Sequence, residues 1–203
     1  MTGNKWFSEE MADKDPFVQF DRWYREHLAE VTIYPESFSL GTSTAEGRVS
    51  VRTVLLKEYG PAGFVFFSNY ESKKGKQLED NPDVSMLFYW PESARQIRIE
   101  GRAEKISPVE SSEYFSSRPR ESQIGAWASW QGSIIPGREF LEKKYLEYEE
   151  KFRGTSVPRP PYWGGYRITP GWFEFWQEGN HRLHDRIVYL QEGTLWKIRR
   201  LSP

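Results

Sequence analysis

The sequence RQIRIEGRAEKI, residues 95–106, alternates in the way that a β-strand does. Its small and apolar positions, Ile97, Ile99, Gly101 and Ala103, are separated by charged residues. Successive side chains of a strand point to opposite faces, so a period of two indicates one buried face and one exposed face. The segment therefore predicts a half-buried strand, beside which other strands must pair.

Strand-like segments lie on both sides of it. They are rich in β-branched and aromatic residues and are bounded by turn residues. They span 37–44, 48–60, 63–69, 84–90, 165–168, 172–176, 186–190 and 195–200. Turns at 45–47 and at Glu192-Gly193 predict hairpins, and no regular alternation of strand and helix is present. The pattern predicts a mainly β fold, an antiparallel barrel with helices packed outside.

Helix signals interrupt the strands at four places. Each combines a capping residue or a proline at the start with apolar residues at helical spacing. The predicted helices are 16–28 after Asp15, a short helix from Ser72 to about Asn81, a helix from the capping box at Ser107 to about Ser117, and 138–152 ending at Gly154. The polar residues 1–14 are expected to form a flexible arm, and residues 15–203 a single domain.

Composition excludes several classes of protein. The chain of 203 residues has no cysteine and a formal net charge of −1. A near-neutral chain is not suited to general binding of nucleic acid, and without cysteine it has neither disulfides nor thiolate metal sites. No apolar run approaches the roughly 20 residues that span a bilayer, and the start resembles no targeting segment. A cytoplasmic protein is the expectation.

The first candidate site lies in ESKKGKQ, residues 71–77. Lys73 and Lys74 fall at the start of a predicted helix, where the macrodipole is already positive. Two cations there are unfavourable unless an anion is bound. Backbone N–H groups, Ser72 and both lysines would together hold a phosphate; the alternative is a solvated basic patch.

Two further motifs contain cations. In VRTVLLK, Arg52 and Lys57 are five positions apart, so on a strand they would point to opposite faces and reach different ligands. In YFSSRPRESQ, Tyr114 and Arg118 share a helix face, and Ser122 is placed to cap the next helix beyond Pro119. The second motif fits another phosphate pocket. The alternatives are strand-end cations near water and an ordinary helix corner.

The last motif is HRLHDR, residues 181–186. His181 and His184 have a spacing that suits a metal on a helix, but the surroundings indicate a loop that enters a strand. The only other histidine is His27. Guanidinium groups favour an anion or an electron-rich ring, so no metal is expected. In an extended segment Arg182, His184 and Arg186 would share one phase, while Asp185 would face away toward a structural partner.

From about Asp15 to Pro203 the chain resembles the pyridoxine (pyridoxamine) 5′-phosphate oxidase family of FMN-binding split-barrel proteins. The motifs that carry the resemblance occur in the family's order. They are RTVLLK, SKKGKQ, RQIRIEG, YFSSRPRESQIGAWAS, EFWQ, RLHDR and the terminal WKIRRLSP. The resemblance implies an antiparallel, Greek-key-like split barrel and a homodimer with FMN in the cleft between subunits.

The resemblance also implies residue roles. Cofactor-binding residues would be Arg52, Val54, Leu55, Lys57, Phe67, Ser68, Lys73, Lys74, Gln96, Gln131, Gly132, Trp176 and Arg186. Substrate-binding residues would be Lys57, Tyr114, Arg118, Ser122, Arg182 and His184, the last two also being catalytic. The implied reaction passes a hydride from C4′ of pyridoxine or pyridoxamine 5′-phosphate to N5 of FMN, and then electrons to O2 to give H2O2.

Two positions depart from the family pattern. Glu178 stands where a small residue is expected, and near Arg182 and Arg186 its carboxylate could pair with them or repel a phosphate. Gly132 stands where serine is common, which removes one hydroxyl from the flavin site. Neither change removes a principal cation, so an active enzyme with altered flavin affinity is expected.

Two other functions remain open. The first is a related split-barrel oxidase acting on another substrate, such as the phenazine-pathway branch; the Tyr-x3-Arg-x3-Ser pocket argues against it. The second is a non-catalytic carrier of flavin or pyridoxal phosphate, which the Arg182 and His184 pair argues against.

Overall fold

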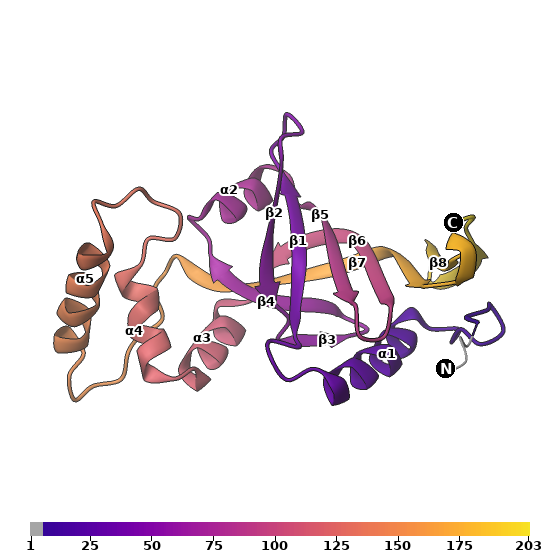
Figure 1. Ribbon diagram of the computed structural model, residues 1–203. Coiled ribbons are helices and arrows are strands. Elements are labelled where there is room, and N and C mark those ends of the chain that lie inside the picture. The colour runs from indigo at the N-terminus through magenta and orange to yellow at the C-terminus, as the bar shows by residue number, and fades with distance from the viewer. Residues whose placement is uncertain (1–5) are drawn as a thin grey trace.

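Nine strands form one antiparallel sheet in residues 6–203, the part of the chain that this computed structural model describes (Figure 1). The strands are β1 (Ser37–Ser43), β2 (Val49–Leu55), β3 (Glu58–Gly60), β4 (Gly63–Asn69), β5 (Asp83–Trp90), β6 (Arg95–Lys105), β7 (Trp163–Gln177), β8 (Asp185–Glu192) and β9 (Leu195–Arg200). The helices are α1 (Pro16–Glu30), α2 (Lys73–Asp80), α3 (Pro108–Ser117), α4 (Arg120–Ala128), α5 (Arg138–Lys151) and the short 3-10 helix η1 (Asn180–Arg182).

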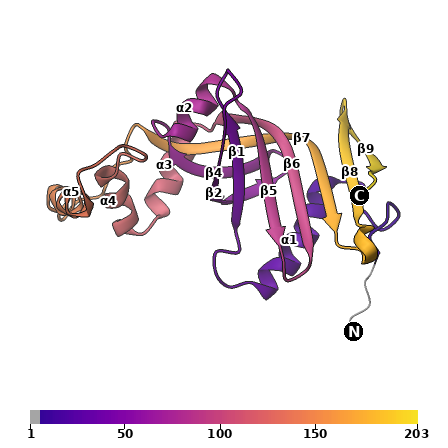
Figure 2. The same cartoon turned by 45° about the horizontal axis from the view of Figure 1, so that its top comes forward.

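The strand order is β2-β1-β5-β6-β7-β4-β3, and β8 and β9 extend the sheet from the far part of β7. The sheet curls into a half-open barrel, with α3, α4 and α5 at one end and β8 and β9 at the other (Figures 1 and 2). The predicted mainly β, antiparallel fold with helices outside is therefore confirmed.

The core fills the inside of the curl. The alternation of β6 buries Ile97, Ile99 and Ala103, as the sequence predicts, and α1 adds the fully buried ring of Phe20. The pairing of β6 with β7 shifts register after Glu100, and a Cβ at Gly101 would lie 2.4 Å from a backbone oxygen of β7. Glycine is therefore required at this point of the strand.

The predicted helix starts are confirmed at atomic level. Asp15 accepts the Phe17 N–H at the start of α1, at 2.8 Å. Ser72 caps α2, and Ser107 forms a reciprocal capping box with Glu110 at the start of α3. These local hydrogen bonds satisfy N–H groups that a helix leaves without partners in its first turn.

A second apolar cluster lies outside the barrel. Phe115 of α3, Ile124 of α4, Phe152 after α5 and Trp163 of β7 are buried together there. This cluster fixes the α3–α4 corner against the start of β7. It thereby forms one wall of the cleft described below.

Two predicted boundaries are wrong. Residues 48–60 form two strands. The Leu56 N–H bonds to Glu36 O, whereas the N–H of the next residue, Lys57, bonds to Val65 O of β4. The chain therefore changes its pairing partner between β2 and β3. Residues 165–176 form part of one strand, β7, which accommodates its glycine and proline at the register shift opposite Gly101.

The packed part of the chain begins before Asp15. The expected flexible arm spans residues 1–14, of which 1–5 lie outside the described residues. Phe7 is buried against Trp23, with ring centroids 4.9 Å apart, and Tyr189 donates its hydroxyl to Asp13 O. Residues 7–14 therefore pack on the barrel. Across residues 6–203, no helix has the length and apolar character needed to cross a membrane.

Candidate functional site

A cleft of about 1090 Å³ opens between β2, β4, the start of α2 and the α3–α4 corner. Its volume lies slightly above the range of about 300–1,000 Å³ that is usual for small-molecule sites, so it has room for more than one small ligand. Residues that the sequence assigned to cofactor or substrate make up much of its lining. They are Arg52, Val54, Leu55, Lys57, Phe67, Ser68, Lys73, Lys74, Tyr114, Arg118, Ser122, Gln131 and Gly132.

The first cationic group in the cleft is formed by Arg52 and Lys74. The Lys74 side chain is buried, and its Nζ donates to Gln131 Oε1 at 2.6 Å and to Ser68 Oγ at 3.0 Å. Arg52 donates to Thr42 Oγ1 at 2.7 Å and to Leu40 O at 2.9 Å. Within residues 6–203, neither cation has an ion pair with a carboxylate.

Burial disfavours the charged form of both groups. It lowers the pKa of Lys74 to about 8, with a further contribution from the charge of Arg52, and it lowers the pKa of the Arg52 guanidinium. Desolvated cations with only neutral partners favour a bound anion. This group therefore fits a phosphate.

The start of α2 reinforces the same end of the cleft. Ser72 Oγ accepts the Gly75 N–H at 3.3 Å, while Lys73 and Lys74 occupy the first two helical positions. A Cβ at Gly75 would lie 2.0 Å from Tyr70 O. Only glycine lets the helix start pack this closely on the end of β4, where Ser68 lies.

The second cationic group surrounds Arg118. Its guanidinium lies over the Trp163 ring, 4.7 Å from the centroid, and its Nη1 is buried without a hydrogen-bond partner in the described chain. Burial lowers the Arg118 pKa. Tyr114 stacks on Phe67 with ring centroids 3.8 Å apart. A buried donor without a partner costs free energy unless a ligand satisfies it, so this group fits a second anion.

Two expectations about this cleft are corrected. Arg52 and Lys57 line the same cleft. Strand β2 ends at Leu55, so the alternation of side chains along the strand does not extend to Lys57. Lys57 forms an ion pair with Glu36 at 3.1 Å. Ser122 does not cap α4: the N-cap is Pro119, and Ser122 lies in the first turn with its N–H bonded to Pro119 O.

The remaining predicted residues lie on another part of the molecule. Gln96, Trp176 and Arg186 are side by side on β6, β7 and β8. Arg186 donates to the buried carboxylate of Glu174 at 2.5 Å, and Arg98 donates to the same carboxylate at 2.9 Å. The pairing raises the pKa of Arg186.

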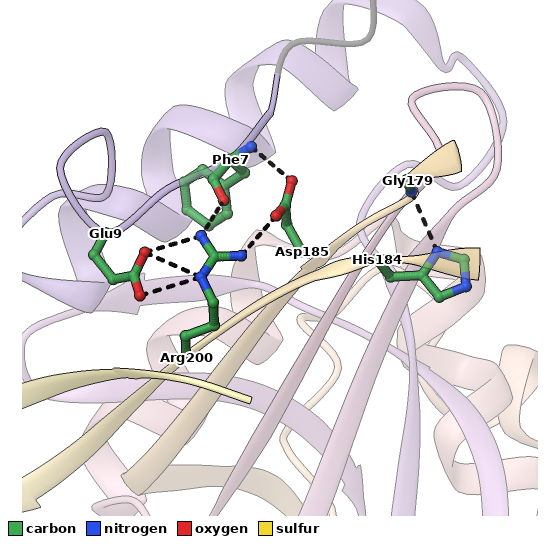
Figure 3. Close-up of polar contacts among 6 residues, drawn as sticks. All are labelled: Phe7, Glu9, Gly179, His184, Asp185 and Arg200. Atoms are coloured by element: carbon green, nitrogen blue, oxygen red, sulfur yellow. Dashed lines mark hydrogen bonds and ion pairs between the residues drawn. The ribbon is translucent and has the colours of Figure 1, made fainter. Parts of the chain in front are cut away.

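Arg182 and His184 lie next to them, but not in an extended segment. Residues 180–182 form η1, with positive φ at His181 (55°) and Arg182 (63°). The shared strand phase expected for residues 182–186 is therefore wrong. His184 Nδ1 accepts the Gly179 N–H at 3.2 Å (Figure 3), and its ring lies 4.8 Å from that of Trp176.

The neighbours of this loop also differ in part from expectation. Asp185 is buried with a structural partner, as predicted: it accepts from Arg200 Nη1 at 2.7 Å. Glu178 is exposed, and its carboxylate pairs with neither Arg182 nor Arg186. His181 is exposed in η1, and the structure gives it no role.

Gly132, found where a serine was expected, has a backbone conformation suited to glycine. Its φ is +89°, in the region that favours glycine, and a Cβ there would meet no atom of residues 6–203 within 4 Å. A serine at this position would strain the backbone, so a Gly132→Ser variant does not isolate the effect of the missing hydroxyl.

Sequence reasoning missed several residues that build the site. Trp163 supports Arg118 and the Tyr114 ring, Glu174 holds Arg186, and Arg200 holds Asp185. An acidic residue alternating with buried aromatics in WFEFW was an available signal for Glu174. Trp163 and Arg200 had none, because their contacts come from distant parts of the chain.

The two sets of residues occupy different ends of one protomer. None of Gln96, Trp176, Arg182, His184 and Arg186 lines the cleft. Strand β8 lies at the end of the molecule away from α4 and α5 (Figures 1 and 2).

Within residues 6–203, no group of three or more histidine, aspartate or glutamate side chains is arranged to hold a metal ion.

Family comparisons cover nearly the whole chain. Residues 24–152 match the model for pyridoxamine 5′-phosphate oxidase, and residues 163–203 match the pyridoxine 5′-phosphate oxidase C-terminal dimerisation region. The pyridoxine/pyridoxamine 5′-phosphate oxidase of Rubrobacter xylanophilus is 50% identical over 97% of this chain and 90% of its own length. That of Cupriavidus taiwanensis is 51% identical over 97% of this chain and 92% of its own length.

Solved structures agree with this assignment. PhzG from Burkholderia lata 383, in complex with tetrahydrophenazine-1-carboxylic acid, superimposes with a TM-score of 0.91 at 31% identity and covers 98% of each chain. A pyridoxamine 5′-phosphate oxidase-related, FMN binding protein from Nostoc punctiforme has a TM-score of 0.74 at 14% identity, over 94% of this chain and all of its own, which shows a shared fold alone. The chain therefore belongs to the pyridoxamine 5′-phosphate oxidase family and is an oxidoreductase.

Proposed function

We propose that this protein oxidises pyridoxine 5′-phosphate and pyridoxamine 5′-phosphate to pyridoxal 5′-phosphate with FMN as its cofactor. Bound FMN would supply the redox chemistry, as acceptor at N5 for a hydride from substrate C4′, with O2 as the final electron acceptor and H2O2 as the product. Relatives of about 50% identity that bear the name of this activity support the proposal.

The observation that carries the proposal is the pair of cationic groups in one cleft. At one end lie the buried Lys74 and the half-buried Arg52, at the other the half-buried Arg118, and none of the three has a carboxylate partner in the described chain. FMN and the substrate each bring one phosphate. Two phosphates would neutralise the two groups, and the space between them, bounded by Phe67 and Tyr114, would hold the two rings.

The residues of the cleft have separate tasks in this proposal. Lys73, Lys74 and Arg52 hold the FMN phosphate and ribityl chain, and Ser68 and Gln131, already bonded to Lys74, keep its ammonium in place. Tyr114, Arg118, Ser122 and Lys57 hold the substrate phosphate. Fixing both ligands orients the substrate carbon against the flavin, which is the main contribution a protein can make to a hydride transfer.

A second protomer completes the site. We place Gln96, Trp176 and Arg186 of one protomer against the FMN bound in the cleft of the other. Arg182 and His184 of the first protomer would lie over the substrate in that same cleft. The match of residues 163–203 to a dimerisation region supports a homodimer. So do Val49 and Val51, which expose apolar side chains on the outer face of β2. Closing this interface would also exclude water from the reacting atoms.

The experiment is a turnover assay on the protein loaded with FMN. With pyridoxine 5′-phosphate in air, we expect pyridoxal 5′-phosphate and H2O2 in equal amounts. With pyridoxamine 5′-phosphate we expect the same aldehyde and H2O2 together with ammonia, which water releases from the oxidised imine. A protein that binds no FMN, or binds it and forms no aldehyde from either substrate, contradicts the proposal.

The similarity to PhzG gives a second candidate, an oxidase of a reduced tricyclic acid. Arg118, whose buried Nη1 has no partner within residues 6–203, would bind the carboxylate of such an acid as well as a phosphate, so it does not separate the two candidates. Tetrahydrophenazine-1-carboxylic acid in the same assay does: its turnover without turnover of pyridoxine 5′-phosphate would favour the second candidate.

A further inference from the structure

The loop that carries Arg182 and His184 is tied to the N-terminal segment by a cluster of four residues, Phe7, Glu9, Asp185 and Arg200, which we name the latch (Figure 3). Asp185 is the first residue of β8 and directly follows His184. Its Oδ2 accepts the Phe7 N–H at 2.9 Å, and its Oδ1 accepts from Arg200 Nη1 at 2.7 Å. Both carboxylate oxygens are thus used by partners far away in sequence.

Arg200, the last residue of β9, donates hydrogen bonds from all three nitrogens of its guanidinium. Besides Asp185, it donates to Phe7 O at 3.1 Å and to the Glu9 carboxylate at 2.9 Å through Nη2, and its Nε donates to Glu9 again at 3.1 Å. The Phe7 ring is buried against Trp23, which fixes the N-terminal end of the latch in the core. The latch therefore joins the N-terminal segment and the end of β9 to the start of β8.

The loop between Gly179 and Asp185 needs such an anchor. His181 and Arg182 both have left-handed backbones, which residues other than glycine adopt only when their surroundings hold them there. Before the loop, the hydrogen-bonded ladder between β6 and β7 ends at Gln177, and the Glu178 N–H bonds to Ala94 O. After the loop, the latch holds Asp185. A Cβ at Gly179 would lie 2.0 Å from Leu183 O, so the loop is also tightly closed on itself.

The hydrogen bond between the Gly179 N–H and His184 fixes the tautomer of the His184 ring. The Gly179 N–H can only donate, so Nδ1 must accept, and the neutral ring carries its proton on Nε2. His184 is then presented to its surroundings as an N–H donor. If the start of β8 moved, the bond to Gly179 would be lost, and the ring could adopt either tautomer.

We infer that Asp185 and Arg200 are positioning residues, which hold the 179–184 loop so that Arg182 and His184 face the substrate with His184 in its Nε2–H form. The inference rests on the proposed function for the task of Arg182 and His184, but the geometry of the loop can be measured without it.

The test compares Arg200→Gln with wild type and with Glu192→Gln. The control breaks the Glu192–Lys197 pair (3.0 Å) at the other end of the same β8–β9 hairpin. Nitrogen NMR of the protein labelled with ¹⁵N-histidine measures the tautomer of each histidine ring. The variants His27→Gln and His181→Gln identify the signals of the other two histidines, which leaves those of His184. We expect the Nε2–H form in wild type and Glu192→Gln, and a mixture of tautomers in Arg200→Gln. An unchanged His184 spectrum in folded Arg200→Gln overturns the inference.

Kinetics of the FMN-loaded protein provide the second readout. We expect kcat/KM to fall by roughly tenfold to a hundredfold in Arg200→Gln, and this effect to become smaller when it is combined with His184→Ala, since only the contribution through Arg182 then remains. An equal effect in both backgrounds would mean that Arg200 does not act through His184, which overturns the inference.

Two other results remain interpretable. If Arg200→Gln does not fold, Glu9→Gln removes only the outer contact of the latch, and we expect the same changes at smaller size. If wild type oxidises neither phosphate substrate, the proposed function fails, while the NMR comparison still decides whether the latch fixes His184.

Discussion

At the scale of single residues, the cleft contains cations, Lys74 among them, that no carboxylate of residues 6–203 neutralises. Lys74 is 8% exposed, its partners within those residues are hydroxyl and amide oxygens, and burial lowers its pKa from 10.5 to about 8. A shift of this size means that the ammonium destabilises the ligand-free fold by roughly 3 kcal/mol at neutral pH. Such a cost is expected where a residue is retained for binding an anion.

The first prediction separates binding from stability at Lys74. Lys74→Met should raise the melting temperature of the FMN-free protein and weaken FMN binding at least tenfold, because it removes both the buried charge and a charge-assisted contact to phosphate. Calorimetry and fluorescence titration with FMN measure the two effects. Lys76→Met, on the exposed face of α2, is the control. A loss of both stability and affinity would contradict this reading of Lys74.

The second prediction concerns pH. The folded protein releases the Lys74 proton near pH 8, whereas the unfolded chain keeps it to about 10.5. Between these values the unfolded state binds more protons, so this residue makes stability rise with pH. The difference in unfolding free energy between FMN-free wild type and Lys74→Met should therefore shrink from pH 7 to pH 10. A difference that stays constant over this window would contradict the lowered pKa.

The third prediction concerns Arg118. Arg118→Lys should raise KM for pyridoxine 5′-phosphate at least tenfold, because lysine loses the forked contact to phosphate and the stacking on Trp163. FMN affinity should stay near the wild-type value. Arg120→Lys is the matched control: Arg120 lies two residues away and donates to backbone carbonyls of Phe152 and Thr155. Equal changes in both variants would point to a structural effect at the corner.

At the scale of elements, sequence predicts what local contacts determine. The helix starts at Asp15, Ser72 and Ser107 follow from caps within three residues of each, and the structure has them where expected. The break between β2 and β3 and the turn of η1 do not follow from the sequence. The first depends on pairing with Glu36 and Val65, and the second is held by contacts from Asp185 to the N-terminal segment.

The same contrast applies to the site. The cations of the predicted site are recognisable in the sequence, because they occur in short motifs. Their distribution over two ends of the protomer is not, since it depends on how β8 extends the sheet from β7. Residue roles assigned from motifs therefore remain predictions until a test that involves both ends.

The fourth prediction tests the close packing of α2. Gly75→Ala should destabilise the protein by about 3 kcal/mol and weaken FMN binding, because a Cβ would collide with Tyr70 O and push the helix start away from the cleft. Gly125→Ala in α4 meets no atom within 4 Å and should stabilise the protein by about 0.5–1 kcal/mol. Denaturant unfolding of both FMN-free variants measures the contrast. Similar stabilities would contradict the packing argument.

At the scale of the whole molecule, the two sets of residues in the proposed site lie apart in one protomer. The cleft with its two cationic groups is lined in part by the α3–α4 corner, whereas the set that contains Arg182 lies around β8, a strand at the end of the molecule away from α4 and α5 (Figure 1). In a dimer with twofold symmetry, each cleft can meet the β8 end of the other protomer. The account therefore requires two composite sites per dimer, each with residues from both chains.

Mixing two inactive variants tests this claim most directly. Arg118→Met alters the cleft and Arg182→Ala alters the β8 end, so each variant alone should oxidise little pyridoxine 5′-phosphate. When the two are refolded together in equal amounts with FMN, half of the dimers are mixed and each has one intact site, which predicts about a quarter of wild-type activity. Recovery to that level would support both the reaction and the shared site, and activity no higher than that of the separate variants would contradict the account.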